Sequence, residues 1–123
     1  MILVVEDDPQ VARLIALVLE RHGQACEIVA EGKKALARAR EARPSIIFAD
    51  LKLKGMGGDA LCSALKSYEE TRSIPFIVVS GDGDIREKAR LCGADDYMGK
   101  PFEFDDLVRL VEKYAGAESS KSD

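Results

Sequence analysis

The chain alternates between short apolar runs and longer segments in which apolar residues recur every three or four positions. Continuous apolar runs bounded by polar residues are typical of strands buried on both faces of a parallel sheet. Such runs occupy residues 2–5, 45–50 and 75–79, and weaker strand patterns occupy 25–29 and 96–99. The pattern therefore predicts five strands, of which 25–29 reads as an edge strand.

Helical spacing fills the segments between these strands. After Pro9, which suits the first turn of a helix, apolar residues recur at i, i+3, i+4, i+7 and i+8, namely Val11, Leu14, Ile15, Val18 and Leu19. Gly23 follows as the predicted end. Further helices are expected at 31–42, 61–68, 85–92 and 104–114, and Asp84 is a plausible N-cap of the fourth.

Five strands that alternate with five helices predict a parallel sheet with helices on both faces. The expected fold is a single-domain α/β sandwich, doubly wound and flavodoxin-like, (βα)5, with strand order 2-1-3-4-5. We expect this domain to span residues 1–115. Residues 116–123 are polar and Ser-rich, and we expect a disordered tail there.

Composition narrows the function classes. The chain has 123 residues, 46% hydrophobic and 33% charged, with a net charge of −4, which is the composition of a globular protein. It lacks the dense Lys/Arg cluster of a nucleic-acid binder and any apolar run of the ~20 residues that would span a membrane. Cys26, Cys62 and Cys92 have no metal-site spacing, so we expect reduced thiols in a cytoplasmic protein.

Chemically competent residues end four of the predicted strands. Glu6 and Asp7 follow the first strand, Asp50 ends the third, and Ser80 and Lys100 end the fourth and fifth. In open α/β sheets, ligands bind at the carboxyl ends of the strands. Clustered carboxylates favour a bound cation, and Mg²⁺, a hydroxyl and a lysine together serve phosphoryl transfer. Each residue alone has an ordinary explanation on a solvated surface or in a turn, so the conjunction is what carries this interpretation.

A carboxylate can itself be the nucleophile in such a site and become an aspartyl phosphate. The motifs that bear on this are residues 2–8, Asp50 with the glycines of 55–58, residues 78–81, and residues 93–102. With these motifs the chain closely resembles the receiver domain of two-component response regulators, over about residues 2–114.

The resemblance implies a phosphorylation-activated signalling switch in a phosphorelay, and not an enzyme that acts on other substrates. Asp50 would accept a phosphoryl group from a histidine kinase or a histidine phosphotransfer protein. Asp7, Asp50 and the backbone carbonyl of Lys52 would hold Mg²⁺, and Glu6 would act through water. Asp8 belongs to the same acidic cluster.

The resemblance also implies that Ser80 and Lys100 contact the phosphoryl group and that the Lys100–Pro101 peptide bond is cis. Tyr97 resembles the switch aromatic, whose ring turns inward when Ser80 moves toward the phosphoryl group. A purely structural role for Tyr97, as an edge-strand aromatic that packs on the last helix, stays open.

The chain also departs from the family pattern. Lys54 stands where the family usually has proline, and Gly57 where an acidic or polar residue is frequent. The segment from Ser80 to Lys100 is shorter than the resemblance implies, and the shortening must fall in the fourth helix or its loops. That helix helps to form the usual signalling and dimer face, so homodimer formation through it stays open.

Two residues past the acceptor is Lys52, and two past the hydroxyl is Asp82. We hypothesise that these opposite charges pair across the mouth of the site and slow hydrolysis of the phosphoryl group, with a modest and salt-sensitive effect. The downstream partner or output domain is outside what the sequence shows.

Two alternatives to a phosphorylated switch stay open. One is a pseudo-receiver, an interaction module that is never phosphorylated. The other is a small phosphatase of the haloacid-dehalogenase type. That family has a second aspartate two positions after the nucleophile, where this chain has Lys52.

Overall fold

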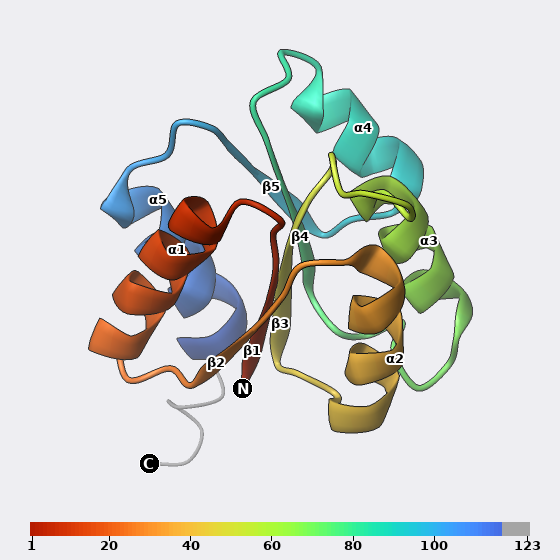
Figure 1. Ribbon diagram of the computed structural model, residues 1–123, viewed down its shortest axis with the longest axis horizontal. Helices are drawn as coiled ribbons and strands as arrows, with labels where there is room; N and C mark the ends of the chain where they lie inside the picture. Colours follow the sequence, from red (N-terminus) through yellow and green to blue (C-terminus); the bar gives the residue numbers. More distant parts are fainter. Residues whose placement is uncertain (117–123) are drawn as a thin grey trace.

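The computed structural model describes residues 1–116 as a five-stranded parallel sheet between two layers of helices (Figure 1). The elements are, in order, β1 (Ile2–Val5), α1 (Pro9–Arg21), β2 (Cys26–Val29), α2 (Gly32–Ala42), β3 (Ile46–Asp50), α3 (Gly58–Ser67), β4 (Phe76–Ser80), α4 (Ile85–Cys92), β5 (Asp96–Gly99) and α5 (Phe104–Val111), followed by a π-helical turn (Glu112–Gly116). The predicted alternation of strands and helices is confirmed.

The strand order is β2-β1-β3-β4-β5, and all four pairings are parallel. The expected doubly wound, flavodoxin-like α/β fold is therefore confirmed. Every residue of β1, β3 and β4 is buried, which explains why their sequences are continuous apolar runs. The strands β2 and β5 lie at the sheet edges and are only partly buried.

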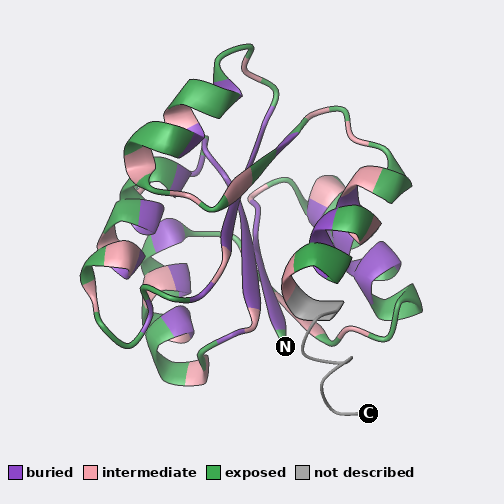
Figure 2. Cartoon of the chain, turned by 180° about the vertical axis from the view of Figure 1, so that it is seen from behind, coloured by how far each residue is buried: buried purple, intermediate pink, exposed green. Residues whose placement is uncertain are grey.

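The core consists of two apolar layers, one on each face of the sheet. Helices α1 and α5 cover one face, and α2, α3 and α4 cover the other (Figure 1). In Figure 2 the buried residues lie on the strands and on the helix sides that turn toward them. Alternate strand residues feed the two layers, so that Ile47 joins the α3 side and Phe48 the α1 side.

Some helix positions differ from the sequence pattern. On α1, Leu14 is 41% exposed while the small residues Ala12 and Ala16 are buried. The buried side of α1 therefore includes these small residues and leaves Leu14 outside it. Phe104 is likewise 59% exposed at the start of α5. Asp84 takes the N-cap position of α4 without the expected side-chain cap hydrogen bond.

The last described turn is fastened to the sheet. The hydroxyl of Tyr114 donates to the backbone carbonyl of Asp95 and to the carboxylate of Asp96, which also pairs with Lys113. Residues 117–123, to which most of the expected tail belongs, lie outside the described residues. No helix within residues 1–116 is both long enough and apolar enough to span a membrane.

Gly58 allows α3 to begin directly behind the end of β3. A Cβ atom at this position would clash with the backbone carbonyl of Asp50 and lie 3.0 Å from the Cα of Leu51. Because both contacts are backbone, neither can yield by a side-chain rotation.

We therefore predict that Gly58→Ala lowers the free energy of unfolding by about 1–3 kcal/mol, the usual cost of overpacking. Gly83→Ala is the matched control, because a Cβ there would meet nothing within 4 Å. Urea denaturation of both variants measures the difference. Equal stabilities would contradict the packing argument.

Candidate functional site

The functional side chains predicted from the sequence meet at one edge of the sheet. Glu6 and Asp7 directly follow β1, and Asp50 is the last residue of β3. Ser80 is the last residue of β4, and Lys100 directly follows β5. Because the strands are parallel, all of these positions lie at the carboxyl edge, and β1 and β3 are neighbours in the sheet.

The Lys100 side chain links two of the carboxylates. Its Nζ donates to Oε1 of Glu6 at 2.8 Å and to Oδ2 of Asp50 at 2.7 Å. The Glu6 and Asp50 side chains are only 2% and 10% exposed. Burial of the ammonium disfavours its charged form and by itself lowers the pKa of Lys100. The hydrogen bonds to Asp50 and Glu6 have the larger combined effect, so the pKa of Lys100 is raised. For Glu6, burial disfavours the charged carboxylate and raises its pKa, although the hydrogen bond from Lys100 acts in the opposite direction.

Three carboxylates converge closely enough to share one cation. One oxygen each of Glu6, Asp7 and Asp50 lies within 4.8 Å of the others, and Asp7 is the most exposed of the three. Mg²⁺ takes oxygen ligands at about 2.0–2.1 Å, so two ligands on opposite sides of the ion lie about 4 Å apart, a separation comparable with the limit found for these three oxygens. The donor set is therefore of the kind that Mg²⁺ prefers.

Asp8 does not join this group. Its Oδ1 accepts the backbone N–H of Gln10 at 2.9 Å and caps α1. Its own backbone N–H donates to Oε2 of Glu6 at 3.1 Å. The structure thus separates the acidic run into an outward helix cap and inward carboxylates.

The loop after Asp50 fixes the second carboxylate oxygen of Asp50. The backbone N–H of Lys52 donates to Oδ1 of Asp50 at 2.9 Å, while Lys100 holds Oδ2. Asp50 is therefore oriented from two sides. The Lys100–Pro101 peptide bond is cis, the isomer that the resemblance implies.

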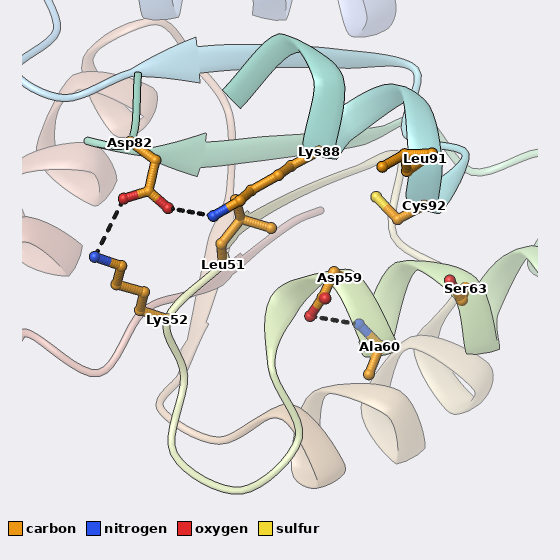
Figure 3. A pocket seen from close by; sticks show the side chains of 9 residues that line it. All are labelled: Leu51, Lys52, Asp59, Ala60, Ser63, Asp82, Lys88, Leu91 and Cys92. Carbon is orange, nitrogen blue, oxygen red and sulfur yellow. Dashed lines mark hydrogen bonds and ion pairs between the residues drawn. The ribbon is translucent and has the colours of Figure 1, made fainter. Parts of the chain in front are cut away.

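Asp82, which follows β4, forms the centre of a charged contact (Figure 3). Its Oδ1 lies 3.2 Å from Nζ of Lys52, and its Oδ2 accepts from Nζ of Lys88 at 2.8 Å. The hydrogen bond from Lys88, followed by that from Lys52, lowers the pKa of Asp82. The backbone N–H of Asp82 donates to Oγ of Ser80 at 3.1 Å.

Sequence reasoning missed the contribution of Lys88. Asp82 and Lys52 do approach each other, but Lys52 is 76% exposed, whereas Lys88 projects from α4 and makes the shorter contact. The signal available in the sequence was the position of Lys88 in the first turn of a helix that starts just after Asp82. Tyr97 lies on the edge strand β5 with 39% of its surface exposed.

Comparison with known proteins decides the family. The family model described as "Response regulator receiver domain" matches residues 2–112. The chain belongs to the response regulator receiver domain family.

Named relatives are consistent with this assignment. The receiver is 33% identical over 112 residues to the DNA-binding dual master transcriptional regulator RpaA of Synechocystis, covering 89% of this chain and 46% of that protein. It is 35% identical over 112 residues to the DNA-binding response regulator MtrA of Mycolicibacterium smegmatis, covering 89% and 48%. The chain thus spans about half the length of these curated relatives.

Solved receiver domains have the same fold. The receiver domain of the sensor histidine kinase PA1611 of Pseudomonas aeruginosa, described with a magnesium ion in its active-site cleft, matches at 30% identity and a TM-score of 0.86, covering 94% of this chain and 96% of that one. The receiver domain of NtrX from Brucella abortus matches at 31% identity and a TM-score of 0.83, covering 93% and 97%. The receiver therefore shares its fold with the receiver domains of other signalling proteins.

Proposed function

We propose that this receiver is a phosphorylation-dependent switch in which Asp50 accepts a phosphoryl group from a histidine kinase or a histidine phosphotransfer protein. One observation carries the proposal: the ammonium of Lys100 binds Asp50 and Glu6 at the point where three carboxylates converge. Such a site combines a carboxylate nucleophile, an ammonium group bound to it, and a set of carboxylates of the kind that binds a metal cation.

Asp7 and Asp50, with the backbone carbonyl of Lys52, would hold Mg²⁺, and Glu6 would act through a coordinated water. When bound, the ion would supply positive charge to the oxygens of an incoming phosphoryl group. The convergence of the three carboxylates supports this assignment, since Mg²⁺ prefers one or two carboxylates together with water and phosphate oxygens.

In the proposed reaction, a carboxylate oxygen of Asp50 attacks the phosphorus of a phosphohistidine. The new P–O bond forms as the P–N bond breaks, and the donor imidazole leaves with the electron pair of that bond. The ammonium of Lys100 already lies 2.7 Å from Asp50, so it can follow the negative charge onto the phosphoryl oxygens without a large movement. Water later attacks the phosphorus, the P–O bond to Asp50 breaks, and inorganic phosphate leaves as the carboxylate is regenerated.

Ser80 links this chemistry to conformation. Its Oγ accepts the backbone N–H of Asp82 in this structure. In the proposed active state, the hydroxyl leaves that partner and donates to a phosphoryl oxygen, and the exposed ring of Tyr97 turns inward behind it. Phosphorylation then shifts an existing equilibrium between two states.

The proposed partners are a histidine kinase or phosphotransfer protein and a downstream protein or output domain, in a cytoplasmic setting. We propose that this domain makes no direct contact with nucleic acid, because its net charge is −4. The chain covers about half of relatives whose names describe DNA binding, so the remaining half of such proteins is available for that role.

Incubation with acetyl phosphate and Mg²⁺ tests the acceptor. We expect intact-mass spectrometry to show one phosphoryl adduct in the wild-type chain, none without Mg²⁺, and none in Asp50→Asn. Asp59→Asn is the matched control, because Asp59 is an exposed aspartate of the same region outside the carboxylate group. An Mg²⁺-independent adduct, or one that survives in Asp50→Asn, would contradict the proposal. A complete lack of adduct would favour the pseudo-receiver.

Mg²⁺ binding is tested by stability. A ligand that binds only the folded state stabilises it by about 2.7 kcal/mol at a concentration 100 times its Kd. We expect MgCl₂ to raise the Tm of the wild-type chain and of Asp8→Asn, since asparagine can still cap α1. Asp7→Asn should lose most of the rise. An equal Mg²⁺-dependent rise in Tm in Asp7→Asn and Asp8→Asn would refute the assignment of Asp7 as a ligand.

We further propose that the Lys52–Asp82 contact restricts the path of water to the phosphoryl group. The contact of 3.2 Å supports this idea, and the exposure of Lys52 limits its strength. Lys88, on α4, binds the same carboxylate. Lys52 and Lys88 on either side of Asp82 would then together restrict the access of water to the phosphoryl group.

Lys52→Ala should therefore speed dephosphorylation at low salt by less than about fivefold, as expected for an exposed pair. The difference should shrink at high salt, where the contact is screened. Lys54→Ala, which removes another exposed lysine of the same loop, is the control. Phosphate release after removal of the phosphodonor measures the rate, and an unchanged rate in Lys52→Ala at low salt would refute the idea.

A further inference from the structure

Four exposed lysines border the functional edge of the sheet. Lys33 and Lys34 follow β2, in the first turn of α2, and Lys52 and Lys54 follow β3, in the loop before α3. Since the strands are parallel, all four lie at the carboxyl edge, as Asp50 does. The two segments follow the strands on either side of β1. We call these four lysines the basic rim.

The two segments that carry the basic rim are packed against each other. Gly32, the first residue of α2, lies so close to the loop that a Cβ atom there would clash with the backbone carbonyl of Met56. Lys33 is therefore next to a residue that touches the loop of Lys54. Lys54 is itself four positions after Asp50, a step of at most about 14 Å in an extended chain. That limit is comparable with the Debye length of about 10 Å at about 0.1 M ionic strength.

Half of the basic rim is not neutralised by ion pairs. Nζ of Lys34 lies 2.8 Å from Oε2 of Glu31, and Nζ of Lys52 lies 3.2 Å from Oδ1 of Asp82. Figure 3 shows the Lys52 side chain extending from its loop toward Asp82. Within residues 1–116, the other two lysines of the rim are in no ion pair. A chain with a net charge of −4 thus keeps unpaired positive charge at this border.

Neither helix stability nor a protein contact explains the basic rim. The first turn of a helix favours Asp and Glu and disfavours cations, because it is the positive end of the helix dipole. The first turn of α2 nevertheless has Lys33 and Lys34 and no acidic residue. The centre of a protein interface is apolar and depleted of lysine, whereas the rim consists of lysines alone. A small anionic solute fits such a surface better.

We propose that the basic rim attracts small, doubly charged phosphodonors of the acyl phosphate class toward Asp50. The inference rests on the proposed function, because it concerns how a donor reaches that acceptor. Glu6, Asp7 and Asp50 converge with one ammonium group among them, so the acceptor group by itself repels a phosphate dianion. Lysines at its border raise the local concentration of such an anion.

The rim acts before the chemical step and takes no part in it. A carboxylate oxygen of Asp50 attacks the phosphorus of the acyl phosphate, and the new P–O bond forms. The P–O bond to the acyl oxygen breaks, and a carboxylate leaves with its electron pair. The rim affects only the approach of a charged donor, so Lys54→Ala stays a valid control for hydrolysis by uncharged water.

The test compares two donors of different charge on the full chain. At neutral pH acetyl phosphate is a dianion, whereas phosphoramidate, with a protonated nitrogen, has a single net negative charge. Electrostatic attraction is proportional to the charge of the donor, so the rate factor for the dianion is the square of that for the monoanion. The rate of adduct formation is measured by intact-mass spectrometry at saturating Mg²⁺ and low donor concentration.

At about 0.1 M ionic strength, we expect Lys33→Gln/Lys54→Gln to form the adduct about fourfold more slowly with acetyl phosphate and about twofold more slowly with phosphoramidate. These factors lie below the tenfold or more of strong electrostatic steering, because only two charges are removed. At about 1 M, where the Debye length is about 3 Å, both differences should vanish.

Arg43→Gln/Arg72→Gln is the matched control. It removes the same charge from two exposed residues that precede β3 and β4, at the opposite edge of the sheet, and should keep the wild-type rates. The lysine double variant should also keep the Mg²⁺-dependent rise in Tm, because removal of cations does not weaken the binding of another cation.

Equal slowing with both donors, a difference that persists at about 1 M salt, or the same loss in the arginine double variant would overturn the proposal. A smaller Mg²⁺-dependent rise in Tm in the lysine double variant would also overturn it, since the slower rate would then come from lost metal. Failure of the proposed function is distinguishable, because the wild-type chain would then form no Asp50 adduct with either donor, which would overturn both proposals.

Discussion

The functional edge depends on one ammonium group held between carboxylates. Lys100 and Glu6 are 94 positions apart in the sequence, yet the parallel sheet brings their side chains to 2.8 Å. Buried carboxylates without a partner are costly, and several together repel one another. The hydrogen bonds from Lys100 offset this cost and join the ends of β1, β3 and β5. Local stability and the phosphoryl chemistry that we propose would therefore come from the same contact.

Around this contact, the backbone completes the orientation of each group. Asp50 is held by a backbone N–H as well as by Lys100, and Ser80 accepts a backbone N–H from Asp82. Backbone donors are fixed by the fold, so they orient side chains at little further entropic cost. Lys52 and Tyr97, by contrast, have exposed side chains. The proposed division between a rigid acceptor and a movable switch has a physical basis in this difference.

The sequence was sufficient for the strand order and for the positions of Asp7, Asp50, Ser80 and Lys100, because buried parallel strands are continuous apolar runs and their ends share one edge. It could not show that Asp8 turns outward as a helix cap, since an aspartate before a helix can serve either use. Nor could it place Lys88 on Asp82. That contact depends on how α4 packs on its neighbours, which no local periodicity encodes.

The shared use of Asp82 constrains how such a receiver can change. One oxygen of this carboxylate contacts Lys52, two residues past Asp50, and the other binds Lys88 on α4. In a domain that works as proposed, the lifetime of the signal and the position of a surface helix would respond to the same residue. A substitution that lengthens the signal would also move α4, so duration and partner recognition would have to evolve together.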